Sequence, residues 1–299
     1  MTVLRHTGII LPISTVVPEF IFLSGLFYNT KLEFKEFLTK RIKVFIIPLF
    51  FFYVISYLFY YLATLVYPPF SEMTDANGIL DIFTQKQLFN GPLWFLPALF
   101  WVHIIYYPIK KYIKLLEYRF GLTIGIGFLG CTLGYYDIFM PMYIDSALSL
   151  MPFIFVSNEL FKLEYLNNRK FITYLTVALC TIIFITIFYK VGIHCTLNKY
   201  GNIMDYILCV IIITHISIFI LFICKLLNLK NFFFNFLGKN SMLIMCIHHL
   251  IYRPVKLISA NLLPSELLPT FTCIVTLLII FAIAPIFNKY LPWAVGKIK

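Results

Sequence analysis

Long apolar runs separated by short charged clusters constrain the fold of this chain more than any other feature. Runs of roughly 17–25 residues match the length of a helix that crosses the hydrocarbon layer of a bilayer. The backbone finds no water in that layer, and a helix satisfies its polar groups within one segment. Only 12% of the residues are charged and 61% are hydrophobic. This composition has too few polar residues to cover the surface of a soluble domain. The sequence therefore predicts an all-α, polytopic membrane helical bundle.

Lysine and arginine residues follow alternate apolar runs, as the positive-inside rule requires of cytoplasmic loops. We attribute the net charge of +11 to this topology and predict no nucleic-acid partner. The alternation places the C-terminus in the cytoplasm and the N-terminus outside. The nine predicted spans cover residues 8–28, 44–66, 91–109, 121–136, 139–161, 171–189, 203–223, 240–258 and 267–287.

Three details of this pattern are more specific. The basic, amphipathic stretch 31–43 predicts a short interfacial helix on the cytoplasmic face. The turn signal Asn90-Gly91-Pro92 precedes the third span, and the Gly-rich fourth span predicts close helix packing. The eighth span is expected to be interrupted at Arg253-Pro254.

An outside N-terminus ahead of nine spans is unusual in a chain whose first residues have no signal-peptide pattern. One further helix before Met1 would restore an ordinary topology, and we expect one there. No internal repeat is visible, which argues against a transporter built from inverted repeats. We predict a single integral membrane domain over residues 1–299.

Four stretches in a fixed order carry a more specific signal. The first is a Phe-rich segment that ends in Ser24-Gly25, followed by the basic segment Lys40-Arg41-Ile42-Lys43 and by Pro48. The others are Gly91-Pro92-Leu93-Trp94-Phe95-Leu96, then Leu237-Gly238-Lys239-Asn240-Ser241 with His248 after it, then Asn288-Lys289-Tyr290-Leu291-Pro292-Trp293 with Gly296-Lys297. In order and spacing, these stretches resemble the acyltransferase family 3 membrane proteins, which O-acylate envelope sugars.

This resemblance implies a bundle of about ten membrane helices in a bacterial-type inner membrane. It also implies an acyl donor, acetyl-CoA or another acyl-CoA, and a glycan acceptor in the cell envelope. The family's catalytic His and an Arg lie on a first helix that has no counterpart here. Where many members have Phe-His-x-Pro before the Ser-Gly pair, this chain has Thr15-Val16-Val17-Pro18. We therefore expect either a truncated chain or a variant of the family.

Ionisable residues inside apolar runs are costly, so each is a functional candidate. We predict catalytic roles for His248, Asp145 and His103, with His248 as a general base on a sugar hydroxyl. Each has a structural alternative: a histidine bonded to a neighbouring helix, a packing aspartate, and an interfacial histidine of an aromatic belt. Glu19 and His215 fit structural roles better.

The basic segment Lys40, Arg41 and Lys43 is the predicted binding site for the phosphates of the CoA donor. The alternative is that these residues hold anionic lipid headgroups and fix the topology. The chain has no Gly-rich phosphate loop, no His-Glu-x-x-His and no nucleophile elbow, so we predict neither a metal site nor serine-esterase chemistry.

The function that we predict is membrane O-acyltransfer, most simply O-acetylation, from acyl-CoA to a sugar hydroxyl of an envelope polysaccharide or glycolipid. Two alternatives stay open. One is an exporter or flippase of polysaccharide precursors, and the other is a catalytically inactive remnant.

Overall fold

The computed structural model describes residues 16–66, 83, 90–160, 176, 179–180, 183, 186, 195–196, 199–200, 203–226 and 231–297. These residues form two compact units. The first unit contains Leu38–Phe100 and Asn231–Lys299, and the second contains Thr15–Phe37 and Trp101–Lys230. Two compact units can belong to one domain, so the single domain expected over residues 1–299 stays a prediction.

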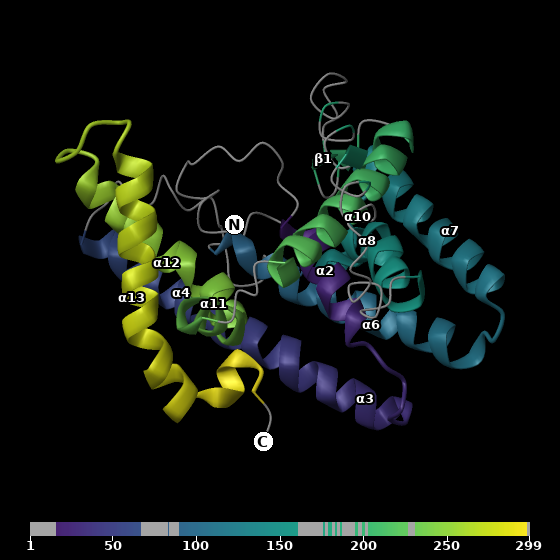
Figure 1. The fold of residues 1–299 in the computed structure, drawn as a ribbon. Helices are drawn as coiled ribbons and strands as arrows, with labels where there is room; N and C mark the ends of the chain where they lie inside the picture. The colour runs from purple at the N-terminus through teal and green to yellow at the C-terminus, as the bar shows by residue number, and fades with distance from the viewer. Residues whose placement is uncertain are drawn as a thin grey trace. The chain divides into compact units, whose positions relative to one another are not determined.

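The first unit is built from helices. Its elements are η1 (Ile42–Ile46), α4 (Ile47–Val66), η3 (Gly91–Trp94), α11 (Phe232–Lys239), α12 (Ser241–Ser259), α13 (Leu268–Tyr290) and η7 (Pro292–Val295). α12 and α13 lie side by side and are joined by a short loop (Figure 1). Two helices cross the boundary between the units, α3 (Phe34–Arg41) and α6 (Phe95–Tyr112).

The basic segment and the span after it form one continuous helical stretch, where the sequence suggested a separate interfacial helix. Between α3 and α4 the backbone widens into the π-turn η1, in which the amide of Ile47 donates to the carbonyl of Ile42. Pro48 follows directly, has no amide hydrogen, and its ring crowds the carbonyl four residues earlier. A π-turn relieves such crowding without ending the helix.

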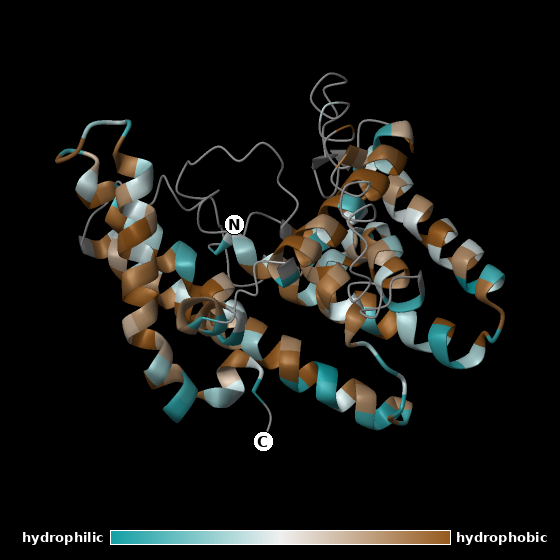
Figure 2. Ribbon diagram, in the orientation of Figure 1, coloured by the Kyte–Doolittle hydropathy of each residue, from teal (hydrophilic) through white to brown (hydrophobic). Residues whose placement is uncertain are grey.

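Aromatic side chains join the helices of the first unit, both at the buried Phe52 and nearer the surface. Phe52 stacks on Phe287 with ring centroids 5.9 Å apart, and Phe236 lies 4.3 Å from Phe281. Other large apolar side chains point outward, such as Leu62 on α4 and Leu278 on α13, which is 64% exposed. Figure 2 shows brown along much of α13. Such faces suit lipid, because soluble proteins seldom expose apolar surface on this scale.

The second unit surrounds the central helix α8. Its elements are α2 (Val16–Leu26), α7 (Leu116–Tyr135), η4 (Pro141–Tyr143), α8 (Ile144–Phe155), η5 (Val156–Leu160), the antiparallel pair β1 (Cys195–Thr196) and β2 (Lys199–Tyr200), and α10 (Ile203–Leu226). α8 packs against both α2 and α7. The side chain of Tyr206 on α10 donates a hydrogen bond of 2.9 Å to the carbonyl of Ser149.

Small residues allow α7 and α8 to approach closely, as the Gly-rich sequence of α7 predicts. A Cβ added to Gly130 would overlap the backbone of Leu148 and Ser149, and one added to Gly127 would lie 2.9 Å from Pro152 Cγ. By contrast, a Cβ on Gly125 meets nothing within 4 Å. Only one side of the helix therefore depends on glycine.

The predicted all-α membrane fold is confirmed. Within the described residues, four helices are long and apolar enough to cross a membrane: Phe34–Leu65, Gly91–Tyr112, Ile203–Lys225 and Leu268–Tyr290. α7, α8 with η5, and α12 match three further predicted spans. α12 continues through Pro254, where the sequence suggested an interruption. The predicted span 171–189 lies almost wholly outside the described residues.

We expect Gly130→Ala to destabilise the protein by roughly 1–3 kcal/mol, because the added methyl group overpacks α7 against the α8 backbone. The matched control is Gly125→Ala on the same helix, which should leave stability unchanged or slightly raised. Thermal unfolding in detergent measures both. Equal midpoints for the two variants would contradict the close approach of these helices.

Candidate functional site

The interior of the first unit contains a group of polar side chains that we term the central polar cluster. Asn90, which is 0% exposed, holds it together. Its Nδ2 donates to Ser56 Oγ on α4 at 3.1 Å and to the carbonyl of Cys246 on α12 at 2.6 Å. One amide thus ties α4, α12 and the start of η3. The members of the cluster are Ser56, Tyr60, Asn90, His248, His249 and Arg253.

His248 lies in the middle of α12 and is fully buried. Its Nδ1 is 2.9 Å from the carbonyl oxygens of Ile244 and Met245. A carbonyl oxygen only accepts, so Nδ1 must carry the hydrogen and donate it. In the neutral ring, the basic lone pair is therefore on Nε2. This is the tautomer that a general base with an oriented ring requires.

The next turn of α12 extends the cluster toward α4. The rings of His248 and His249 are 5.3 Å apart, and His249 is 5.0 Å from Tyr252. The guanidinium carbon of Arg253 is 5.6 Å from the centre of the Tyr60 ring, a cation–π distance. A Cβ on Gly91 would lie 3.5 Å from His249 Cε1, so the backbone of η3 passes close to this histidine.

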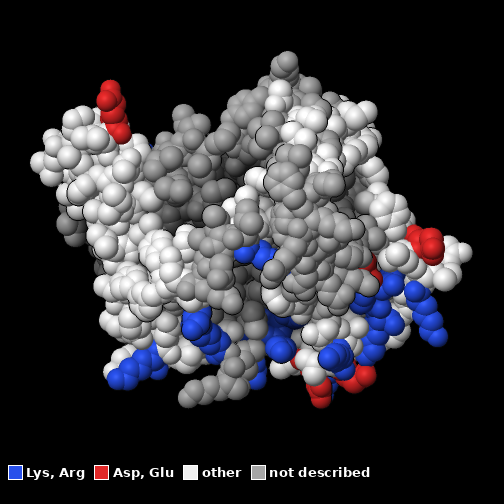
Figure 3. All heavy atoms as spheres, in the orientation of Figure 1, with Lys and Arg blue, Asp and Glu red and all other residues white. Residues whose placement is uncertain are grey.

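Basic side chains gather at one end of the first unit. Lys40 and Arg41 end α3, Lys43 lies in η1, and Lys239 and Lys289 lie at the ends of α11 and α13. In the part that holds α12 and α13, Figure 3 shows the basic groups at the end opposite the α12–α13 loop. Lys40 and Lys43 are exposed, whereas Arg41 is half-buried. The predicted donor-binding residues thus lie together on the stretch that leads into α4.

His103 lies in the second unit and is buried among protein side chains. Its Nε2 is 3.2 Å from Ser24 Oγ, and its ring meets the edge of Tyr28 at 5.2 Å. The hydroxyl of Tyr28 donates to the His103 carbonyl at 2.8 Å. Ser24 in turn donates to the carbonyl of Ile21. His103 therefore fixes the Ser-Gly end of α2 against α6.

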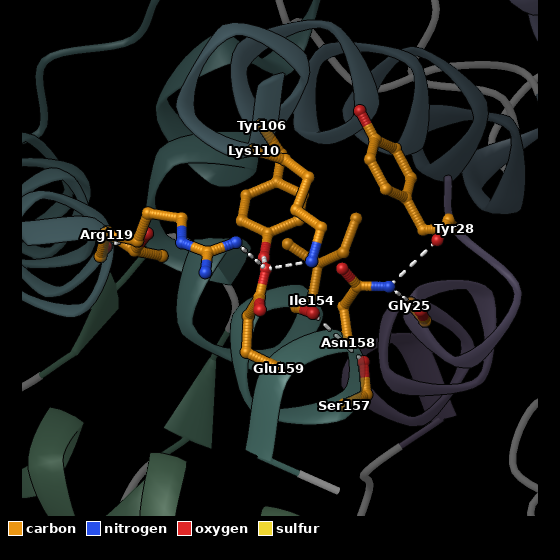
Figure 4. A network of polar contacts seen from close by, with 10 residues as sticks. Gly25, Tyr28, Tyr106, Lys110, Arg119, Ile154, Ser157, Asn158 and Glu159 are labelled. Atoms are coloured by element: carbon orange, nitrogen blue, oxygen red, sulfur yellow. Dashed lines mark hydrogen bonds and ion pairs between the residues drawn. The ribbon is translucent and has the colours of Figure 1, made fainter. Parts of the chain in front are cut away.

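Glu159 is the centre of a second polar network, shown in Figure 4. Its side chain is 7% exposed, and Oε1 accepts hydrogen bonds from Lys110 at 2.5 Å, Arg119 at 2.7 Å and Tyr106 at 3.0 Å. The neighbouring Asn158 donates to the carbonyls of Gly25 and Tyr28 at 2.8 and 2.9 Å. Through these two adjacent residues, η5 joins α2, α6 and α7.

Asp145 is buried at the first turn of α8, where an acidic group favours the helix N-terminus. Its Oδ1 accepts a long hydrogen bond of 3.4 Å from the amide of Met140. Between them, Met142 and Tyr143 have φ of 53° and 59°, which makes the turn a tight one. This contact helps to hold the turn that begins α8.

The structure thus places the three predicted catalytic residues in two units: His248 in the first, and His103 and Asp145 in the second. Their catalytic roles stay predictions. Sequence reasoning missed Asn90, which looked like a turn residue before Gly91-Pro92. It also missed Glu159, although an acid near the basic end of an apolar run was a signal that could have found it. His215 donates from Nδ1 to its own helix at Ile211.

We expect Glu159→Gln to lower the unfolding free energy by about 2–4 kcal/mol, because Lys110 and Arg119 lose a buried counter-charge. The control is Glu33→Gln, which breaks the ion pair with Lys111 at a carboxylate that is 82% exposed. Exposed pairs add little, so this variant should unfold like the wild type. If both variants unfold alike, the Glu159 network does not stabilise the second unit.

Comparison with known proteins gives one match. The model of the acyltransferase family 3, described as an acyltransferase domain, matches residues 7–287, which is nearly the whole chain. No curated protein and no solved structure gave a significant match. The resemblance drawn from the four sequence stretches is therefore confirmed, and this chain belongs to the acyltransferase family 3 membrane proteins.

Proposed function

We propose that this membrane acyltransferase transfers an acyl group, most simply acetyl, from acyl-CoA to a sugar hydroxyl of a cell-envelope glycan. The observation that carries the proposal is the orientation of His248. Its Nδ1 is bonded to two carbonyl oxygens of α12, which leaves Nε2 as the base in a buried site. The same unit ends in the exposed cations Lys40 and Lys43, with Arg41 beside them.

In the proposed reaction, Nε2 of His248 takes the proton of the sugar hydroxyl as its oxygen attacks the thioester carbonyl. The carbon–sulfur bond then breaks, and the proton on Nε2 passes to the departing CoA thiolate. His248 ends the cycle neutral, with its hydrogen on Nδ1 as before. General-base catalysis of this kind is typically worth about 10²–10⁴ in rate.

The distance between the basic end and His248 suits a long donor. His248 is seven residues beyond Ser241, which places it ~10 Å along α12 from the basic end. In coenzyme A, the pantetheine arm separates the thioester from the phosphates by a long flexible chain. Phosphates held by Arg41 and its neighbours would therefore allow the thioester to reach His248. We place this basic end in the cytoplasm, together with the C-terminus of the inner-membrane chain.

We expect His248→Gln to reduce acyl transfer by about 10²–10⁴, because glutamine cannot take the hydroxyl proton. The measurement is the O-acetyl content of envelope glycans in cells that express wild type or variant at matched levels. His215→Gln is the control, since it removes a histidine with a similar Nδ1–carbonyl bond elsewhere. Full acetylation with His248→Gln would exclude the base, whereas lost surface glycan with normal acetylation would favour the exporter.

The donor site gives a separate prediction. Arg41→Gln should raise KM for acyl-CoA about tenfold and change kcat little, because a phosphate contact made equally in the ground and transition states affects binding alone. Lys31→Gln, a charge removed from an exposed loop, should leave KM unchanged. Initial rates in membrane vesicles at varied acyl-CoA provide both constants. An equal KM in the two variants would exclude Arg41 from donor binding.

A further inference from the structure

The described residues of the first unit carry an unusual excess of positive charge. Eight of them are Lys or Arg and one is acidic, Glu266. Arg253 and Lys256 lie toward the far part of α12, and Glu266 lies in the loop between α12 and α13. At the basic end, the described residues of this unit include no carboxylate. The cations there are Lys40, Arg41, Lys43, Lys239, Lys289 and Lys297.

A chain of side-chain amides holds one of these cations in place. Lys297 Nζ donates to Asn288 Oδ1 at 2.6 Å, Asn288 Nδ2 donates to Asn240 Oδ1 at 2.8 Å, and Asn240 Nδ2 donates to the Phe236 carbonyl. The final carbonyl can only accept, so it fixes the direction of every bond and the orientation of both amides. Asn288 accepts one of the three hydrogens of the ammonium group and brings no negative charge.

The backbone turn that carries Lys297 is also fixed by its packing. Lys297 follows Gly296, whose φ of 68° favours glycine. A Cβ on Gly296 would lie 2.9 Å from the carbonyl oxygen of Val44 and 3.0 Å from Met242 Sδ. The amide of Lys297 also donates to the Pro292 carbonyl at 2.9 Å. The turn that carries Lys297 is thus packed against η1, the segment that contains Lys43.

Lys239 is next to Asn240 in sequence and adds a second charge at this place. The side chain of Lys297 is exposed, and slight desolvation together with the charge of Lys239 lowers its pKa below the ordinary value. A surface lysine that serves only the positive-inside rule requires neither an amide chain nor a tight turn to fix its position. Lys289 differs in this respect, because its ammonium lies 5.0 Å over the ring of Tyr290.

We propose that Lys239 and Lys297, with Lys297 held by the Asn288–Asn240 amide chain, form a binding site for a phosphate group. Neutral amides hold the ammonium in place and leave its charge available to an anion, where a carboxylate would neutralise it. The phosphate has two possible sources, the CoA donor and the headgroup of an anionic lipid. The first source rests on the proposed function, whereas the second is independent of it.

The test uses the full chain in nanodiscs and two variants of this site. Lys297→Gln removes the cation, and Asn288→Asp keeps the shape but adds a counter-charge. Lys289→Gln is the matched control, because it removes one charge from the same end of α13. Calorimetry measures the affinity for coenzyme A in phosphatidylcholine nanodiscs, and native mass spectrometry measures retained phosphatidylglycerol in mixed nanodiscs. Both site variants should weaken binding of one probe about tenfold, with Lys289→Gln within twofold of wild type.

The two probes distinguish the sources. A loss confined to coenzyme A assigns the site to the donor, and a loss confined to phosphatidylglycerol assigns it to the lipid. Both site variants behaving like Lys289→Gln with both probes would overturn the phosphate site. If wild type binds coenzyme A in that case, the proposed function survives without this site. If wild type binds only the lipid and the variants lose it, the site stands and the proposed donor fails.

Discussion

The first unit depends on one buried amide in an apolar interior. Inside a membrane, a polar group without a partner has no water to bind, so each must be satisfied within the protein. Asn90 meets this condition by donating to both α4 and α12. Those two helices also carry Tyr60, His248 and Arg253, so the bond that anchors η3 fixes the frame of the central polar cluster. The histidine that we propose as the base is thereby carried by a helix that the same contact holds in place.

In the second unit, buried polar groups are satisfied by ion pairs. Glu159 is buried beside Lys110 and Arg119, and the three groups compensate one another where each alone would be costly. Asn158 uses the adjacent position to bind the backbone at the end of α2. This network sets the position of Ser24 and Tyr28, which contact His103. The geometry around His103 thus follows from the packing of η5. Its contacts are those of a residue that positions the Ser-Gly segment, and they do not require a catalytic role.

Much of the fold could be predicted from the sequence, because apolar run length and the spacing of basic residues act locally. They predicted α4, α6, α10 and α13 within a few residues, and the glycines of α7 predicted its close packing. Less of the candidate site could be predicted from the sequence. His248 stood out as an ionisable residue in an apolar run, but its tautomer depends on where its ring lies against α12. Asn90 and Tyr60 have no distinguishing pattern, because their roles arise from partners far away in the sequence. The predicted interruption at Arg253-Pro254 was wrong, because a proline removes only one backbone hydrogen bond and the helix continues past it.

The contrast between the two units bears on what the cations do. In the second unit, Lys110 and Arg119 are compensated by a buried carboxylate and serve packing. In the described part of the first unit, the only acid lies in the α12–α13 loop, and Lys297 is held by an amide. A carboxylate at position 288 would neutralise the ammonium charge, whereas the asparagine amide accepts its hydrogen bond and adds no charge. A neutral partner leaves the charge of the lysine available to an anion that binds reversibly. The choice of asparagine at position 288 is therefore the feature that separates an anion site from a topological charge.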